Sequence, residues 1–281
     1  MHFHLSHIIP AKSMHGLNGY KEVIDTVAWG LTQLGHSVSY GVNELSTQGR
    51  NILFGAQVLE MSVLEQLPGD TIVYNFEQAR NTSPETAKPQ MKLAAQRFEI
   101  WDYSAANMAM WEALGALRAE VVPVGYAPVL QRLPHVDTQD IDVLVYGMPG
   151  QERLRAFHYL SHAGLACVFV CGLYGAARDE LIARSKIVLN VTLYEQSKIF
   201  EIVRVSYLMA NRKAVVAAVD PDTIIEADVA QGIRTASGGD IVTACQELAG
   251  DDALRARLED AAFAAISRRD IRAILAEVVD S

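Results

Sequence analysis

A loop near the start of the chain carries residue types that could bind a substrate and move a proton. The segment Lys12 to Tyr20 reads KSMHGLNGY and follows an apolar run. Because an imidazole ordinarily titrates near neutral pH, His15 could act as a general base, while Gly16 and Gly19 would let a ligand approach the backbone. Asn18 adds an amide, and a helix beginning near Gly19 offers free N–H groups. The alternative is a loop whose histidine only hydrogen-bonds the backbone.

This loop matches neither of two familiar nucleotide-binding motifs. It lacks the GxGxxG pattern, and no acidic residue follows at the distance of a ribose site, so NAD binding is not supported. The sequence also lacks GxxxxGK[ST], which argues against a P-loop kinase or ATPase.

A second polar group follows the strand expected at 71–75. Asn75, Glu77 and Gln78 combine a carboxylate with two amides, which suits a hydroxyl-rich ligand. They could equally cap the loop. Ser104, after the similarly placed Asp102, has the position of a helix N-cap.

Two glycine-bearing loops in the second half join strands to helices. Gly147 keeps the first turn open, and Arg153 stands in the following helical turn, where a cation can help to hold an anion. In the second loop Gly175 leaves room for a flat ring, and Tyr174 could stack on it. Both loops are also plausible as turns without any ligand.

The segment 186–210 is the most informative. We expect a strand, a polar loop and a buried helix over 198–210, on which Lys198, Glu201 and Arg204 form one charged stripe. Such a stripe is costly unless it is paired or faces a polar cleft. Either the three residues pair with one another, or Lys198 and the helix N-terminus bind a diphosphate while Glu201 binds ribose. The preceding Glu195 could bind sugar hydroxyls.

No metal site is expected. Asp140-Ile-Asp142 precedes its strand and so lies at the wrong end of a sheet, and a turn and a helix cap explain Asp220-Pro-Asp222. His2 and His4 share one face of a strand but have no third ligand.

Strands and helices alternate along the whole chain, which predicts parallel sheets with ligands at the carboxyl ends of their strands. Residues 129–140 lose this periodicity and form the predicted linker between two Rossmann-like domains, 1–128 and 141–269, that face each other across a cleft. The tail over 238–280 is expected to be helical, and 270–281 to cross back to the first domain. The expected strands are 2–9, 37–41, 51–54, 71–75, 119–123, 141–146, 166–170, 186–191 and 213–218, and the expected helices are 19–34, 59–66, 86–97, 104–116, 151–164, 176–184 and 198–210.

The composition supports a folded protein of the cytoplasm. The 281 residues are 50% hydrophobic with a net charge of −9, and this charge makes nucleic acid a poor partner. Cys167, Cys171 and Cys245 form no CxxC pair, which favours a reducing compartment. The first ten residues do not resemble a signal peptide, and no stretch is long enough for an integral membrane segment.

The second half resembles the nucleotide-binding half of GT-B glycosyltransferases of the group 1 type. The features that carry the resemblance are the segments 142–147 (DVLVYG), 183–190 (ARSKIVLN) and 212–217 (RKAVVA), with Tyr194-Glu195 leading to Phe200-Glu201. Residues 18–60 are similar to the first half of capsule- or polysaccharide-associated members.

The resemblance implies an α/β protein of two Rossmann-like domains that transfers a sugar from a nucleoside diphosphate sugar to a glycan or other acceptor. The donor would be a co-substrate, with no cofactor and no required metal. Donors in this family contact a glutamate pair spaced E-x7-E, whereas only five residues separate Glu195 and Glu201. His15 or Glu77 would take the acceptor proton. The alternatives are an epimerase or hydrolase of the same fold and a non-catalytic nucleotide- or sugar-binding protein; no oligomeric state is predicted.

Overall fold

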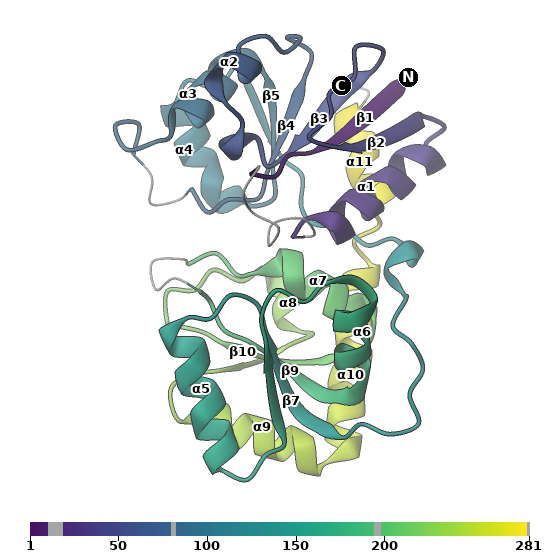
Figure 1. The fold of residues 1–281 in the computed structure, drawn as a ribbon, viewed down its shortest axis with the longest axis vertical. Helices are drawn as coiled ribbons and strands as arrows, with labels where there is room; N and C mark the ends of the chain where they lie inside the picture. The colour runs from purple at the N-terminus through teal and green to yellow at the C-terminus, as the bar shows by residue number, and fades with distance from the viewer. Residues whose placement is uncertain (11–18, 80–82, 194–197, 280–281) are drawn as a thin grey trace. The chain divides into compact units, whose positions relative to one another are not determined.

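The chain divides into two compact units in a computed structural model, which describes residues 1–281 except 11–18, 80–82, 194–197 and 280–281 (Figure 1). Unit 1 comprises Met1–Ala127 and Asp270–Ser281, and unit 2 comprises Pro128–Arg269. Each unit is built around one parallel sheet, as strand–helix alternation predicts.

The sheet of unit 1 has six strands within the described residues, in the order β2-β1-β3-β4-β5-β6. Its central strands are buried on both faces, which explains the consecutive apolar residues 52–54 in β3 and 72–74 in β4. The last residue of β1, His7, pairs in register with Val42 on one side and Phe54 on the other. The strands are β1 His2–His7, β2 Ser37–Val42, β3 Arg50–Phe54, β4 Ile72–Asn75, β5 Glu99–Asp102 and β6 Arg118–Val121.

Strand β5 was missing from the expected strands because two of its four residues are charged. Both carboxylates are buried and accept hydrogen bonds, but among the described residues only Glu99 has cationic partners. Glu99 lies 2.6 Å from Arg50 and 3.1 Å from Arg118, and it also accepts the Trp101 Nε1–H. Hydrogen bonds described below hold Asp102. These partners offset the cost of burying carboxylates in a sheet.

Helices cover both faces of this sheet. Helix α1 (Lys21–Gln33) and the C-terminal α11 (Ile271–Val279) pack together, and the bare backbone of Gly30 lets Ile271 and Leu275 approach closely (Figure 1). The other face carries α2 (Met61–Leu64), α3 (Pro89–Arg97) and α4 (Met108–Ala113).

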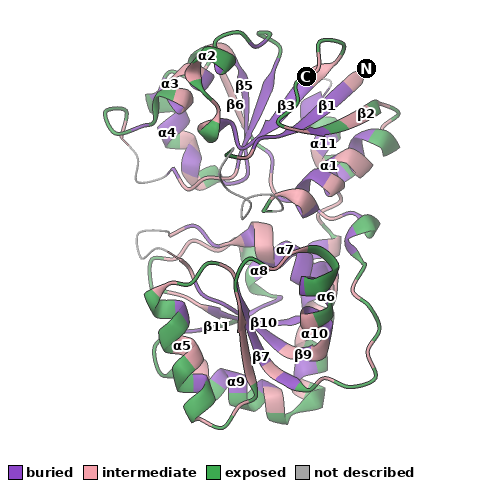
Figure 2. Cartoon of the chain, viewed as in Figure 1, coloured by how far each residue is buried: buried purple, intermediate pink, exposed green. Residues whose placement is uncertain are grey.

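Unit 2 contains a five-stranded sheet, among the described residues, in the order β11-β10-β9-β7-β8. Figure 2 shows its strands largely buried and the outer side of α5 exposed. Helices α5 and α9 pack on one face, and α6, α7 and α10 on the other (Figure 1). The elements are β7 Ile141–Tyr146, α5 Gln151–His162, β8 Cys167–Val170, α6 Gly175–Arg184, β9 Ser185–Asn190, α7 Ile202–Ala210, β10 Ala214–Ala218, α8 Ala227–Ala230, β11 Arg234–Ala236, α9 Asp240–Gly250 and α10 Asp252–Ser267.

The helix expected over 198–210 begins only at Ile202, so this expectation was wrong for its first turn. Backbone hydrogen bonds run from Phe200 N to Ile224 O and from Ile224 N to Lys198 O. The segment before α7 is therefore extended and paired with another loop. Lys198 does not share a helical face with Glu201 and Arg204.

Several side chains hold the predicted linker against the rest of unit 2, among them Gln139, Arg184 and Asn211. Asn211, just after α7, accepts backbone N–H groups of Arg132 and Leu133 at 3.0 and 3.1 Å and donates to Leu130 O at 2.8 Å. Because these bonds satisfy backbone groups outside any sheet, the irregular segment can lie against the unit without regular structure.

No helix in the part of the chain that the structure describes is long and apolar enough to span a bilayer.

Gly55 gives a direct test of the turn after β3. Its φ is +94°, and a Cβ there would lie 2.5 Å from the backbone oxygen of Ile8. We expect Gly55→Ala to lower the free energy of unfolding by about 2–4 kcal/mol, because left-handed strain and overlap with backbone add together. Gly69 is the control, since a Cβ there meets no atom within 4 Å. Gly69→Ala should change stability by less than about 0.5 kcal/mol in urea unfolding; equal losses in both variants would contradict this account.

Candidate functional site

In both sheets, the carboxyl edge is where parallel strands place ligand-binding loops. In unit 2, β7 lies between β8 and β9. The chain first goes from β7 to β8 on one side and then crosses from β8 to β9 on the other side. Such a reversal of strand order opens a crevice at the strand ends. Gly147 follows β7 and Asn190 ends β9, so both lie at this point.

Arg153 is the buried centre of this edge. Its side chain is only 2% exposed. Its Nε donates to Val191 O at 2.7 Å, its Nη1 to Met148 O at 3.0 Å, and its Nη2 to Glu201 at 3.2 Å. The loop after β7, the loop after β9 and the start of α7 are thus held by one guanidinium group.

Arg204 is the more accessible cation, with a side chain 21% exposed. Its Nη1 lies 3.1 Å from Glu201 Oε2, and its guanidinium carbon lies 5.1 Å from the centre of the Tyr146 ring. One carboxylate therefore bridges two arginines, and an aromatic ring supports the outer one.

Gly147 is what allows both arginines to reach this position. Its φ is +123°, and a Cβ there would come within 2.8 Å of Arg153 Nη1 and 3.0 Å of Arg204 Nη2. Any side chain would push the guanidinium groups aside. The glycine expected to keep a turn open therefore leaves space for the two arginine side chains.

The electrostatics of this cluster favour an anion. Arg153 and Arg204 bring two positive charges against the one negative charge of Glu201. Burial and the nearby charge of Arg204 lower the pKa of Arg153 to about 10, despite the opposing effect of Glu201. A negatively charged ligand beside Arg204 would relieve this repulsion.

Lys198 lies apart from the arginine cluster in its interactions. Its Nζ is 2.8 Å from Asp220 and 3.2 Å from Asp222, and hydrogen bonds to these carboxylates raise the pKa of the ammonium group. Asp220 does form a turn with Thr223, as expected, but helix α8 starts only at Ala227. The acidic pair thus balances a lysine and does not cap a helix.

The remaining residues predicted for the second half lie at loop positions or outside the described residues. Tyr174 is the N-cap of α6 and Gly175 its first residue, with φ +60°. Glu195 lies outside the described part of the chain.

In unit 1 the structure brings Asn75 and Glu77 together at the end of β4. Asn75 donates to Glu77 O at 3.0 Å and accepts Glu77 N–H at 3.2 Å. The Glu77 carboxylate accepts from Gln57 at 2.8 Å and from the Tyr20 hydroxyl at 3.1 Å. Gly19 precedes Tyr20, whereas His15, Gly16 and Asn18 lie outside the described residues.

The buried carboxylate of Asp102 holds two of the residues that hydrogen-bond to Glu77. Asp102 is fully buried and accepts hydrogen bonds from Asn75 and Trp111 at 2.7 Å and from Asn107 at 3.0 Å. Burial raises its pKa, while the donors oppose this shift. Asn107 also donates to Glu77 O, so Asp102 positions the loop that carries Glu77. Ser104 accepts Ala106 N–H, which confirms its expected role as a cap.

His7 was not predicted as a site residue, yet it ends β1 at the carboxyl edge of this sheet. It is fully buried; its Nδ1 lies 3.3 Å from the Tyr40 hydroxyl, and within the described residues its Nε2 has no hydrogen-bond partner. Burial, with a smaller contribution from Lys21, lowers its pKa and favours the neutral ring. Its place as the last residue of a buried strand was the only available sequence signal.

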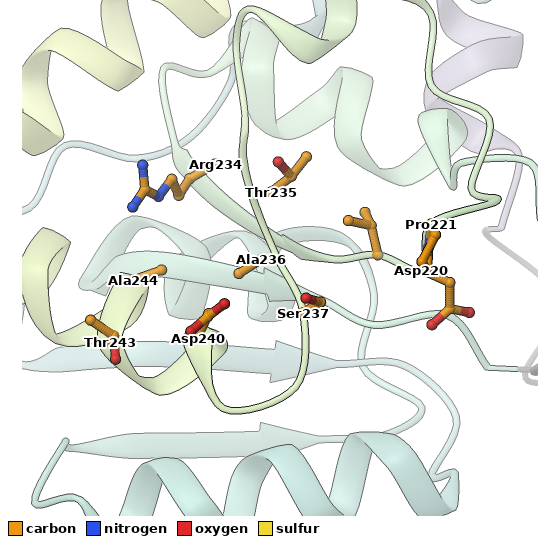
Figure 3. Close-up of a pocket in the computed structure, with 10 residues that line it drawn as sticks. Asp220, Pro221, Arg234, Thr235, Ala236, Ser237, Asp240, Thr243 and Ala244 are labelled. Carbon is orange, nitrogen blue, oxygen red and sulfur yellow. The ribbon is translucent and has the colours of Figure 1, made fainter.

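A separate polar hollow of about 510 Å³ lies over the ends of β10 and β11 and the start of α9 (Figure 3). Its side chains include the carboxylates of Asp220 and Asp240 and several hydroxyls. Arg234, in the same lining, lies 3.3 Å from Glu247. The hollow does not include the arginine cluster.

Among the described residues no group of three or more His, Cys, Asp or Glu could hold a metal ion. His2 and His4 both hydrogen-bond the Ser39 hydroxyl, at 3.0 and 2.8 Å.

No protein-family model and no curated protein matches the sequence. Solved glycosyltransferases do match the structure over almost its whole length. AviGT4, a glycosyltransferase involved in avilamycin A biosynthesis, is 15% identical with a TM-score of 0.61, and the match covers 99% of this chain and 96% of that one. HepE of Anabaena in complex with UDP-glucose is 13% identical with a TM-score of 0.59, covering 99% and 98%. Sucrose-phosphate synthase of Thermosynechococcus elongatus is 11% identical with a TM-score of 0.61, covering 99% and 98%.

The chain has the GT-B fold. The expected fold class is thereby confirmed. Because one fold can host several activities, the function of this GT-B protein has to be argued from its site.

The burial of His7 predicts a pH dependence of stability. Its pKa is lowered below the ordinary 6.5 in the folded state, so the unfolded chain binds a proton first as the pH falls. The wild type should therefore lose stability relative to His7→Leu below pH 6.5, by at most about 1.4 kcal/mol per pH unit. Urea unfolding of both proteins between pH 5 and 8 measures this difference. A relative gain in stability on acidification would instead show that the folded protein stabilises the imidazolium.

Proposed function

We propose that this GT-B protein is a glycosyltransferase that moves a sugar from a nucleoside diphosphate sugar to an acceptor. The observation that carries the proposal is the cluster of Gly147, Arg153, Glu201 and Arg204, with its excess positive charge, at the strand reversal of unit 2. Departure of a nucleoside diphosphate develops negative charge, and a preorganised cation stabilises that charge in the transition state.

The solved relatives support the choice of ligand. HepE has been captured with UDP, with UDP-glucose, and with UDP and glucose. WaaG, a glycosyltransferase of lipopolysaccharide biosynthesis, has a TM-score of 0.59 over 99% of this chain and 98% of that one, at 11% identity. By analogy we propose a nucleotide sugar as the donor and a glycan, of capsule or another polysaccharide, as the acceptor.

The geometry suggests different roles for the two arginines. Arg204 would contact the diphosphate, because its side chain is partly exposed and donates to no backbone carbonyl among the contacts described above, unlike Arg153. Arg153 is a positioning residue, since its donors are directed to two carbonyls and to Glu201. Because arginine charge can stabilise the leaving diphosphate, the proposed reaction requires no metal.

The other predicted roles form part of the same proposal. Glu201 would contact ribose, Tyr174 and Gly175 the base, and Glu195 the sugar. Lys198 would add to the diphosphate site only if it leaves its two aspartates. The acceptor proton would go to His15 or Glu77, with Asp102 positioning the Glu77 loop.

Arg204→Gln is the first test of the donor site. We expect calorimetry with UDP, GDP, CDP and ADP to show micromolar binding of one nucleotide, weakened about 10- to 100-fold in Arg204→Gln through loss of a charge-assisted contact. Arg155→Gln is the control, because Arg155 is half exposed and pairs only with the neighbouring Glu152 among the described residues. Lys198→Gln separately tests the predicted diphosphate contact of that lysine. Binding of none of the four nucleotides would overturn the proposed donor, and binding without any sugar transfer would indicate a non-catalytic protein.

Gly147→Ala tests the role of the bare backbone. The new Cβ would displace both guanidinium groups, so affinity for the same nucleotide should fall at least about tenfold, in addition to a stability loss of about 1–3 kcal/mol from the left-handed backbone. Gly164→Ala is matched, since Gly164 has φ +86° but a Cβ there meets no atom within 4 Å. It should lose stability while keeping full affinity. An equal loss of affinity in both variants would attribute the effect to strain alone.

A further inference from the structure

Asn190 is the last residue of β9 and has no exposed surface. Its Nδ2 has no hydrogen-bond partner within the residues that the structure describes. A buried amide that lacks a partner destabilises the folded state, so an unpaired group of this kind needs an explanation. A leucine of similar shape would avoid the cost.

The other atom of the same amide identifies the surroundings. Asn190 Oδ1 accepts from Arg204 Nη1 at 3.4 Å, a long contact. The unpaired nitrogen is bonded to the same carbon as this oxygen, so it lies beside the more accessible guanidinium of the cluster. An oxyanion bound to Arg204 would find Nδ2 as a second donor once the atoms that cover this buried amide move aside.

The position on the sheet agrees with this assignment. Asn190 pairs in register with Ala217 of β10, and on its other side β9 pairs with β7. Its side chain therefore stands where the strand order reverses, at the edge that holds Gly147 and Arg204. A neutral donor there adds a hydrogen bond for an anion without adding further charge to two arginines that already repel each other.

We propose that Asn190 is a further ligand-binding residue, whose Nδ2 donates a hydrogen bond to a diphosphate oxygen held by Arg204. This inference rests on the proposed function and identifies the part of the donor that the residue recognises. The unpaired amide is then explained as a group whose partner arrives with the ligand.

The test combines stability and affinity in Asn190→Leu. Since Nδ2 has no partner in the free protein, the melting temperature should stay the same or rise. Affinity for UDP and for UDP-glucose should fall about tenfold, and by the same factor for both, because both carry the diphosphate. Asn190→Asp keeps the acceptor for Arg204 but replaces the donor by a carboxylate, so it should bind both ligands more weakly still. This second variant also covers the possibility that leucine does not fit.

Asn51→Leu provides the matched control. Asn51 is also buried on a strand, but its amide donates to Ser46 O at 2.9 Å and accepts Ser46 N–H at 2.8 Å. This substitution should lower the melting temperature and leave affinity unchanged.

Three results are distinguishable. If the wild type binds none of UDP, UDP-glucose, GDP, CDP and ADP, the proposed donor fails and the inference falls with it. If the wild type binds and both Asn190 variants bind equally well, only the role of Asn190 is overturned. If the variants weaken UDP-glucose alone, Nδ2 contacts the sugar, and the assignment to diphosphate is wrong.

Discussion

The geometry of the proposed donor site depends on the burial of one guanidinium group. Arg153 is inside unit 2, and a buried cation is stable only when carboxylates and carbonyls surround it. The carbonyls come from Met148 and Val191, and the carboxylate comes from Glu201. Satisfying this one residue fixes the loops after two strands and the start of α7. The same requirement places Glu201 beside Arg204, so the buried Arg153 helps to orient the partly exposed arginine that we propose contacts the diphosphate.

Unit 1 achieves a similar result with the opposite charge. Asp102 is buried without a cationic partner among the described residues, and its carboxylate is held by neutral N–H donors from Asn75, Asn107 and Trp111. Two of these donors also hold the backbone of Glu77. In each unit a buried charged residue, Arg153 or Asp102, organises the carboxyl edge and positions a partly exposed residue, Arg204 or Glu77.

The sequence predicted what depends on local pattern and missed what depends on pairing across the chain. Apolar runs and turn residues located most strands, and the alternation of strands and helices indicated two parallel sheets. Strand β5 was missed because Glu99 and Asp102 look unsuitable for a buried strand until Arg50, Asn75 and Trp111 are known to lie next to them. The false first turn of α7 has the same origin, since apolar residues at helical spacing gave no sign that Ile224 pairs with this segment.

The difference between local pattern and pairing across the chain also explains which residues of the candidate site were predicted. Glycines and charges after strands were visible in the sequence, so Gly147, Glu201 and Arg204 were each named as candidates, and the structure places the three side by side. Asn190 was read as part of a strand, because nothing in its sequence context separates a paired buried amide from an unpaired one. Only the arrangement of neighbours shows that its Oδ1 has a partner and its Nδ2 does not. An unpaired polar atom is a property of the folded molecule, and at the edge where two strand connections diverge it is more informative about ligand binding than any motif in this chain.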